Sequence, residues 1–327
     1  MYNRETENLG QYDLHITKVS KARGGTVLNC EEGDYLLKSY DGSLRRLEVM
    51  HRILEEAQEE GFLVDAPVPD RDGNLSFVDA YGECFSLRKW YMAKECDPKN
   101  AADVIRGTIY LGKLTAFLQS VSATYRKEVL VPGHEFGPEV ARHNRELKNI
   151  SNYIRGKRQK NEFEELFRKQ FDLYYQQGLK TALLEQEFQT TGQVREGICH
   201  RDYTHHNVFL REEDTILVHF DNLGWDSIVC DFSLFLRKVM EKNNWSRVLA
   251  EEMIHYFDES VHLTKQEYQQ LYLRLLYPVR FLKIANHYAN RKKSWVSVRD
   301  LDKLRSLRQQ EEDRQQFLVF LRSYVVY

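Results

Sequence analysis

The chain has 327 residues, and its 47 basic and 49 acidic side chains give a formal net charge of -2. This balance excludes the strongly basic field of a nucleic-acid-binding protein, and the 12% aromatic residues exclude a mainly disordered chain. The polar segment Met1–Glu7 lacks the apolar core of a signal peptide, and no apolar run approaches the roughly 20 residues of a membrane-spanning helix. Five scattered cysteines indicate free thiols in a reducing compartment. We therefore expect a cytoplasmic globular protein with no nucleic-acid partner and no membrane partner.

The first ninety residues predict short strands around one helix. Strand-like runs at 26–30 and 35–40 flank a turn that contains a glycine, which indicates a hairpin. Apolar residues at helical spacing predict a helix over 44–60, and short strand patterns return over 68–90. Residues 1–90 are therefore expected to form a small β-rich lobe.

From about residue 101 the pattern becomes helical and stays so to the C-terminus. Only residues 197–221 break it, with strand-like runs between long amphipathic stretches. We expect a larger, mainly helical lobe over 91–327 with one embedded loop region at 199–231. The fold class is then α+β with two unequal lobes, an arrangement in which a cleft between the lobes suits a nucleotide and a second substrate.

The segment 199–210 reads Cys-His-Arg-Asp-Tyr-Thr-His-His-Asn-Val-Phe-Leu and contains the spacing His-x-Asp-x-x-x-x-Asn. Phosphoryl transfer from ATP needs a carboxylate that accepts or orients the acceptor hydroxyl, and an oxygen ligand for the metal ion on the phosphates. Asp202 suits the first role and Asn207 the second, and the apolar run at 208–210 predicts a strand that fixes the loop. The alternative is a polar loop whose side chains bond to their own backbone.

A nucleotide kinase also needs a lysine on a strand of the small lobe to hold the phosphates. Lys38 lies in the second strand of the predicted hairpin, where such a lysine belongs. Glu48, on the only nearby predicted helix, is the candidate ion-pair partner of this lysine. A solvated glutamate at that position is the alternative interpretation. Lys38 and Glu48 are thus predicted to bind the cofactor.

Together these residues resemble the aminoglycoside phosphotransferase and choline kinase superfamily, a branch of the protein-kinase-like fold. The strongest resemblance is to the CotS-type spore-coat proteins of endospore-forming bacteria. It is carried by 199–208, by 219–232 and by the C-terminal signature, which reads Tyr-Pro-Val-Arg-Phe-Leu-Lys-Ile-Ala-Asn-His-Tyr at 277–288 and Lys-Lys-Ser-Trp at 292–295.

The resemblance implies a bilobal kinase-like fold, with ATP and Mg²⁺ as cofactors and a small molecule or sugar as acceptor. It implies that His200, the first residue of the motif, buttresses the catalytic loop. It also implies other spore-coat proteins as partners, and a protein made in the mother-cell cytoplasm and assembled into the spore coat.

The expected metal site departs from the family pattern. Relatives follow the catalytic loop with an aspartate that chelates the metal, and with polar or acidic positions about seven and twelve residues further on. Counted from His219, the acidic residues Asp221, Asp226 and Asp231 fall at offsets of two, seven and twelve, so His219 occupies the position of the metal-binding aspartate. Mg²⁺ prefers oxygen ligands, whereas manganese and zinc tolerate an imidazole better. The predicted metal ligands are Asn207, Asp221 and His219.

Two functions remain open from the sequence. The first is an ATP-dependent phosphotransferase that acts on a hydroxyl, and the presence of Lys38, Asp202 and Asn207 favours it. The second is a catalytically impaired pseudokinase that serves as a structural component of the spore coat, and His219 favours it.

Overall fold

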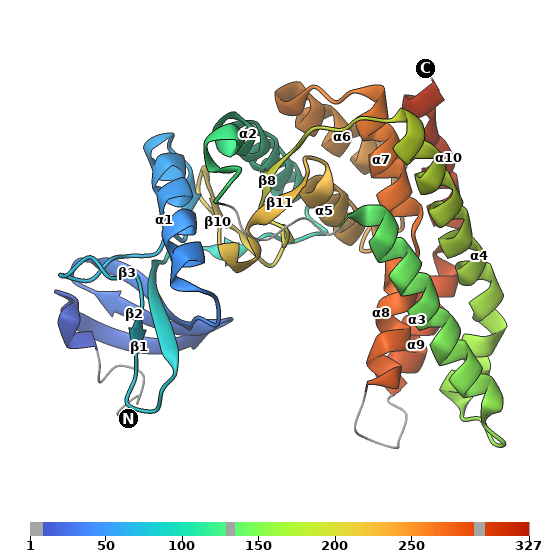
Figure 1. The fold of residues 1–327 in the computed structure, drawn as a ribbon, viewed down its shortest axis with the longest axis horizontal. Helices are drawn as coiled ribbons and strands as arrows, with labels where there is room; N and C mark the ends of the chain where they lie inside the picture. Colours follow the sequence, from blue (N-terminus) through green and yellow to red (C-terminus); the bar gives the residue numbers. More distant parts are fainter. Residues whose placement is uncertain (1–8, 129–134, 291–297, 327) are drawn as a thin grey trace. The chain divides into compact units, whose positions relative to one another are not determined.

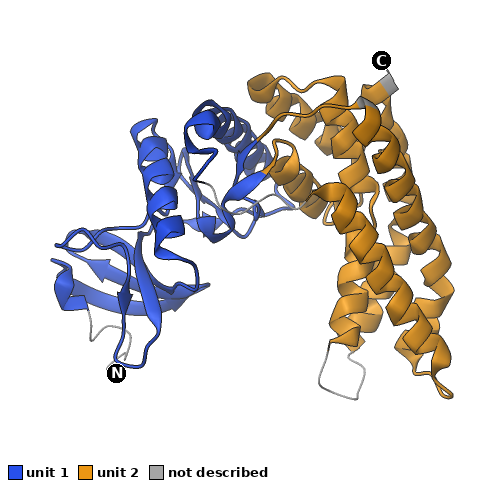
Figure 2. Cartoon of the chain, in the orientation of Figure 1, with its two compact units in different colours: residues 1–132, 197–225 blue, residues 133–196, 226–327 orange. Residues whose placement is uncertain are grey.

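A computed structural model describes residues 9–128, 135–290 and 298–326, and the chain folds into two compact units. Unit 1 comprises residues 1–132 and 197–225, and unit 2 comprises residues 133–196 and 226–327 (Figure 2). The lobe boundary expected at residue 90 falls inside unit 1. The loop region expected at 199–231 belongs to unit 1 as far as residue 225.

Unit 1 begins with the short helix η2 (Leu9–Gln11) and an antiparallel sheet of five strands in the order β1-β2-β3-β6-β5 (Figure 1). These strands are β1 (Ile16–Ala22), β2 (Gly25–Cys30), β3 (Gly33–Ser39), β5 (Phe77–Val78) and β6 (Cys84–Lys89). The β2–β3 pairing confirms the predicted hairpin. The edge strand β1 was not predicted, because its side chains are exposed or half-buried and show no alternation of apolar and polar residues.

Helix α1 (Leu44–Glu59) confirms the helix predicted from the apolar spacing. Ser43 caps it, because the Ser43 side chain accepts a hydrogen bond from the backbone N–H of Arg46. The helix buries one face, which includes Leu47, Met50 and Leu54. It therefore packs as an amphipathic element of unit 1.

A second sheet of unit 1 has the strand order β4-β10-β9-β7. Its strands are β4 (Leu63–Val64), β7 (Lys94–Glu95), β9 (Val208–Arg211) and β10 (Asp214–Leu217), and β9 confirms the strand expected after the motif loop. Helix α2 (Ala101–Tyr125) and the single turn η3 (Phe220–Asn222) also belong to this unit. The division between the units passes through β8 (Glu196–Cys199) and β11 (Gly224–Ser227).

Unit 2 is mainly helical, as the sequence predicts. Its helices are α3 (Phe136–Gly156), α4 (Glu162–Thr191), α5 (Cys230–Met240), α6 (Arg247–Val261), α7 (Lys265–Leu276), α8 (Val279–Ala289), α9 (Val298–Gln309) and α10 (Glu311–Val326). The signature segment 277–288 falls mostly on α8, whereas 292–295 lies outside the described residues. Within the described part of the chain, none of the helices combines the length and the apolar character that crossing a membrane requires.

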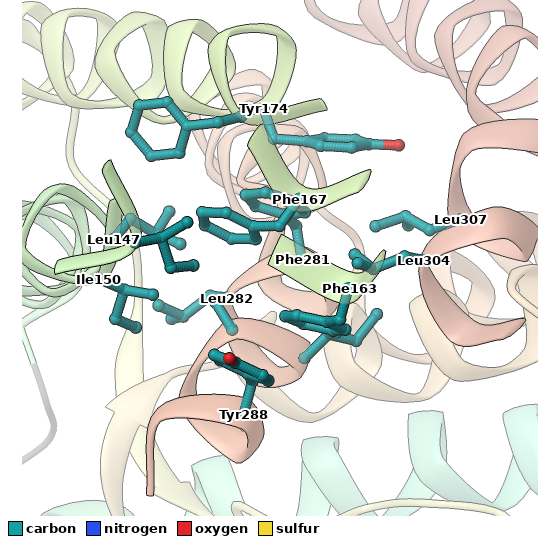
Figure 3. Packing of buried hydrophobic residues seen from close by; sticks show 14 of the residues in the cluster. Leu147, Ile150, Phe163, Phe167, Tyr174, Phe281, Leu282, Tyr288, Leu304 and Leu307 are labelled. Carbon is teal, nitrogen blue, oxygen red and sulfur yellow. The ribbon is translucent and has the colours of Figure 1, made fainter. Parts of the chain in front are cut away.

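The core of unit 2 contains a layer of aromatic rings from α4 and α8, flanked by aliphatic side chains of α3 and α9 (Figure 3). Phe163 stacks on Tyr288 with ring centroids 4.2 Å apart, and Phe167 stacks on Phe281 at 5.0 Å. Tyr174 continues the layer by stacking on Phe281 at 4.6 Å. Aromatic side chains bury large areas and dominate core energetics, so this layer fixes α8, and with it the signature segment, against α4.

Candidate functional site

All of the residues predicted for the site lie in unit 1, so their geometry is that of one compact body. They come from β3, from α1, from the loop between β8 and β9, and from the turn after β10; the residues are Lys38, Glu48, His200, Asp202, Asn207, His219 and Asp221.

His200 is fully buried and braces the loop from inside. Its Nδ1 accepts a hydrogen bond from the backbone N–H of Asp202 at 3.1 Å, so Nε2 carries the ring proton and donates to the carbonyl oxygen of Val218, also at 3.1 Å. Burial lowers the pKa of His200 to about 4. The ring is therefore neutral at pH 7, in one tautomer, and it ties the start of the loop to the end of β10.

Asn207 fixes the orientation of the Asp202 carboxylate. The Asn207 Nδ2 atom donates to Asp202 Oδ2 at 2.9 Å and to the Asp202 carbonyl oxygen at 2.8 Å. Asn207 is itself held by backbone hydrogen bonds with Thr204 and Val218. Among the described residues Asp202 Oδ1 accepts no hydrogen bond, so this oxygen is open to a further donor. The amide oxygen of Asn207 is likewise the atom through which this residue could ligate a cation.

The register of the first sheet places two cationic side chains on one face. Lys38 on β3 pairs with Ser86, and Leu36 pairs with Arg88. Because side chains alternate along a strand, Lys38 and Arg88 project to the same side. The Lys38 ammonium donates to Nδ1 of His219 at 3.1 Å and to Oδ2 of Asp221.

Glu48, the predicted partner of Lys38, is exposed on α1. Among the described residues no hydrogen bond or ion pair joins Glu48 to Lys38. The ion-pair partner that the structure brings to Lys38 is Asp221, from the turn after β10.

Asp221 is the centre of the polar cluster. Its Oδ1 accepts a hydrogen bond from Arg88 Nη2 at 2.9 Å, and Arg88 is fully buried. Arg46 on α1 donates through Nη2 to the carbonyl oxygens of Asp221 and Leu223. Burial raises the pKa of the Asp221 carboxyl, but the positive charges of Arg88 and Lys38 lower it by more than burial raises it. The resulting pKa lies below the usual range. Asp221 is therefore ionised at neutral pH and shared between two cations.

His219 sits in a left-handed backbone conformation, with a φ of +70°. Its backbone N–H donates to Asp65 Oδ2 at 2.8 Å, because the parallel pairing of β4 with β10 brings Asp65 beside the end of β10. Burial and the neighbouring Lys38 ammonium lower the pKa of His219 to about 4, so the imidazole is neutral. Gly24, in the β1–β2 turn, lies against this ring: a Cβ atom at Gly24 would be 2.8 Å from His219 Cε1.

Sequence analysis did not identify Arg88, Asp65 or Arg46. The sequence does contain an indication of Arg88, because a charged residue within a strand is unusual. Arg88 also lies two residues after Ser86, the residue that pairs with Lys38, and so it points to the same face of the sheet. Asp65 likewise follows an apolar pair within a short strand. Arg46 has no comparable signal, since an arginine in the first turn of a helix is usually solvated.

The donor set does not suit Mg²⁺. Mg²⁺ requires oxygen ligands in octahedral geometry, and the Asp221 carboxylate already accepts hydrogen bonds from Lys38 and Arg88. No group of three or more His, Cys, Asp or Glu side chains arranged to hold a metal ion occurs in the part of the chain that the structure describes. A nucleotide fits better, since Lys38 lies beside the glycine turn that would cover its phosphates.

A sequence model of the phosphotransferase enzyme family matches residues 26–272 of the chain. The chain belongs to this family. This phosphotransferase-family chain is also homologous to spore coat protein S of Bacillus subtilis (strain 168), with 26% identity over 163 residues. That match spans 48% of this chain and only 46% of the relative.

Solved structures with this fold include an aminoglycoside phosphotransferase from Alicyclobacillus acidocaldarius, with a TM-score of 0.82 and 20% identity over 97% of this chain and 95% of that chain. A spectinomycin phosphotransferase bound to AMP has a TM-score of 0.67 and 12% identity over 95% of each chain. The amicoumacin kinase hAmiN, solved with AMP-PNP and Ca²⁺, has a TM-score of 0.60 and 15% identity over 95% of this chain and 96% of that chain. These likenesses confirm the predicted kinase-like α+β fold.

Proposed function

We propose that this protein binds a nucleoside triphosphate in unit 1 and transfers its terminal phosphoryl group to a hydroxyl of a small molecule or sugar. The observation that carries the proposal is the pair formed by Asp202 and Asn207. A single amide donates one hydrogen bond to Oδ2 of the carboxylate and one to the backbone carbonyl of the same residue, and it leaves Oδ1 open. This is the geometry of a group that orients an acceptor hydroxyl. The neutral, buried His200 acts as a positioning residue behind this pair.

In the proposed reaction, the hydroxyl oxygen forms a bond to the γ-phosphorus as the bond between that phosphorus and the β–γ bridging oxygen breaks. The hydroxyl proton passes to Asp202, and the nucleoside diphosphate leaves. We assign Lys38, which is 3.1 Å from His219 and hydrogen-bonded to Asp221, as the cation that holds the phosphates.

The test is phosphate transfer to a panel of amino alcohols and sugars, measured as nucleoside diphosphate release. Asp202→Asn should lower turnover at least about 100-fold, the lower range for loss of a general base. Asp214→Asn is the matched control, because Asp214 is a half-exposed aspartate that pairs with Arg211 on the neighbouring β9. Equal turnover of the two variants would remove Asp202 from the mechanism.

A second candidate is a catalytically impaired protein that serves as a structural component of the spore coat. His219 favours it, since the spacing of the acidic residues puts the imidazole where we expect a metal-binding aspartate. The homology with spore coat protein S also favours it. We propose the spore coat as the location in both cases, with other coat proteins as partners. If the Asp202→Asn variant assembles into the coat as the wild type does while no acceptor supports turnover, the structural role is favoured.

A further inference from the structure

We propose that Arg88 is the built-in cation of this site: it occupies Asp221, closes this carboxylate to a divalent metal ion, and makes nucleotide binding independent of Mg²⁺. The inference rests on the proposed nucleotide site and specifies how that site is charged. Arg88 acts through Asp221 and is therefore a positioning residue, since its guanidinium is fully buried and contacts no solvent.

The first step of the argument is the occupancy of the Asp221 oxygens. Oδ2 accepts from the Lys38 ammonium, and Oδ1 accepts from Arg88 Nη2 at 2.9 Å. A divalent ion on either oxygen would approach a fixed positive charge at close range, where the repulsion is strong because the site is largely buried. Arg88 cannot move away to relieve this repulsion, because the buried guanidinium would then lose Asp221, its only carboxylate partner among the described residues.

The second step is the state of His219. Its Nδ1 faces the Lys38 ammonium at 3.1 Å, so the lone pair on this nitrogen is already used and the ring proton sits on Nε2. The other side of the ring lies against Gly24, whose Cβ position would be 3.4 Å from Nε2. A metal ion, including the softer ions that tolerate imidazole, could therefore bind this ring only by displacing the Lys38 contact at Nδ1 or the proton at Nε2.

The third step is the balance of charge around the turn after β10. Two carboxylates, Asp65 and Asp221, lie among three cations, Lys38, Arg46 and Arg88, and all five side chains belong to unit 1. A site that recruits a divalent cation needs an excess of negative charge, whereas this one is already compensated by its own side chains. Such a site can attract phosphate groups directly.

The test uses the full-length protein and two probes. Mn²⁺ binding is followed by the electron paramagnetic resonance signal of free Mn²⁺, and ADP binding is followed by calorimetry in EDTA and in Mg²⁺. We expect the ADP dissociation constant of the wild type to change by less than about threefold between the two conditions, and we expect Arg88→Met to bind Mn²⁺ at least about tenfold more tightly than the wild type does.

Arg46→Met is the matched control. It removes one positive charge from the same cluster but leaves both oxygens of the Asp221 carboxylate occupied, because Arg46 contacts only backbone carbonyls there. Its Mn²⁺ affinity should stay within about threefold of the wild type. An equal gain in Arg46→Met and Arg88→Met would mean that net charge, not the Arg88 contact, controls the site, and would overturn the inference.

Two further outcomes separate this inference from the proposed function. Failure of ADP to bind with or without Mg²⁺ would count against the nucleotide site, while the Mn²⁺ comparison would still decide the role of Arg88. If Arg88→Met does not fold, Asp221→Asn in the wild-type background decides it. Mn²⁺ binding by the wild type that disappears in Asp221→Asn would show that the carboxylate is open, and would overturn the inference.

Discussion

Gly24 and His219, which are 195 positions apart in the sequence, are in contact: the missing Cβ of Gly24 would lie 2.8 Å from His219 Cε1. The glycine turn between β1 and β2 thus rests on the residue that we expect to occupy the position of a metal-binding aspartate. Lys38, on β3, donates a hydrogen bond to Nδ1 of the same imidazole ring. The imidazole therefore serves as a packing and hydrogen-bonding element within unit 1, which is a role that an aspartate side chain could not fill in the same way.

The first prediction concerns this contact. Gly24→Ala should destabilise the protein by about 1–2 kcal/mol for its φ of +86°, and by about 1–3 kcal/mol more for overpacking against His219. Gly73→Ala is the matched control, because Gly73 has a φ of +85° and nothing within 4 Å of its Cβ position. Urea unfolding measures both, and equal losses would show that the His219 contact carries no cost.

The same contact can be isolated with a double-mutant cycle. In a His219→Ala background the ring is absent, so the extra cost of Gly24→Ala over Gly73→Ala should fall to near zero. A cost that persists in this background would place the strain elsewhere in the turn.

The second prediction concerns restoration of the metal site. His219→Asp adds a carboxylate beside Asp221, but Arg88 still occupies Oδ1 of that residue. We therefore expect His219→Asp alone to raise Mn²⁺ affinity by about threefold to tenfold, and the His219→Asp/Arg88→Met double variant to gain more than the product of the two single effects. Failure of the double variant to bind Mn²⁺ would contradict the alignment of His219 with the metal-binding position.

The sequence predicted those parts of the fold and site that depend on local patterns. The β2–β3 hairpin followed from its glycine turn, α1 from its apolar spacing, and the loop containing Asp202 and Asn207 from a motif. The strand after that loop followed from its apolar run.

What the sequence could not supply is pairing between distant segments. Glu48 is the partner expected for Lys38 because it lies on the nearest predicted helix, yet Lys38 binds Asp221, 183 positions away. Arg88 binds the same aspartate because the register between β3 and β6 places its side chain on the face of the sheet that carries Lys38. Such contacts depend on strand order and register, which one sequence does not reveal.

The third prediction concerns the aromatic core of unit 2. Phe167 is almost fully buried and stacks on Phe281 (Figure 3). Phe167→Ala should lower the free energy of unfolding by about 3–5 kcal/mol, since it removes a buried ring and leaves a cavity. Leu183→Ala on the same helix is the control, because Leu183 is 58% exposed and its loss should cost less than about 1 kcal/mol. Thermal or denaturant unfolding that showed similar costs for both variants would contradict this account of the core.

The fourth prediction concerns the ion pair in unit 2 between the buried carboxylate of Glu267 and the half-exposed guanidinium of Arg195. Arg195 donates through Nε and Nη2 to the two oxygens of Glu267, each at 2.8 Å, and the Glu267 side chain is only 1% exposed. Arg195→Met should cost about 2–3 kcal/mol, below the usual range for a broken buried pair because water can reach the vacated site. Arg305→Met, which breaks an exposed pair with Glu162, should cost less than about 1 kcal/mol.

The pH dependence of the Arg195 effect provides the sharper test. Burial raises the pKa of the Glu267 carboxyl, but hydrogen bonds from the Arg195 guanidinium and from the backbone N–H of Thr264 lower it by more than burial raises it. The resulting pKa lies below the ordinary value of 4.5. A carboxyl with a depressed pKa contributes stability that is fully present above the ordinary pKa and is lost as the pH falls through the folded-state pKa. The difference in unfolding free energy between wild type and Arg195→Met should therefore be constant from pH 6 to 8, within about 0.5 kcal/mol, and should shrink below about pH 4.5. A difference that stays constant through the acid range would show that Arg195 stabilises unit 2 through packing of its side chain and not through the charge on Glu267.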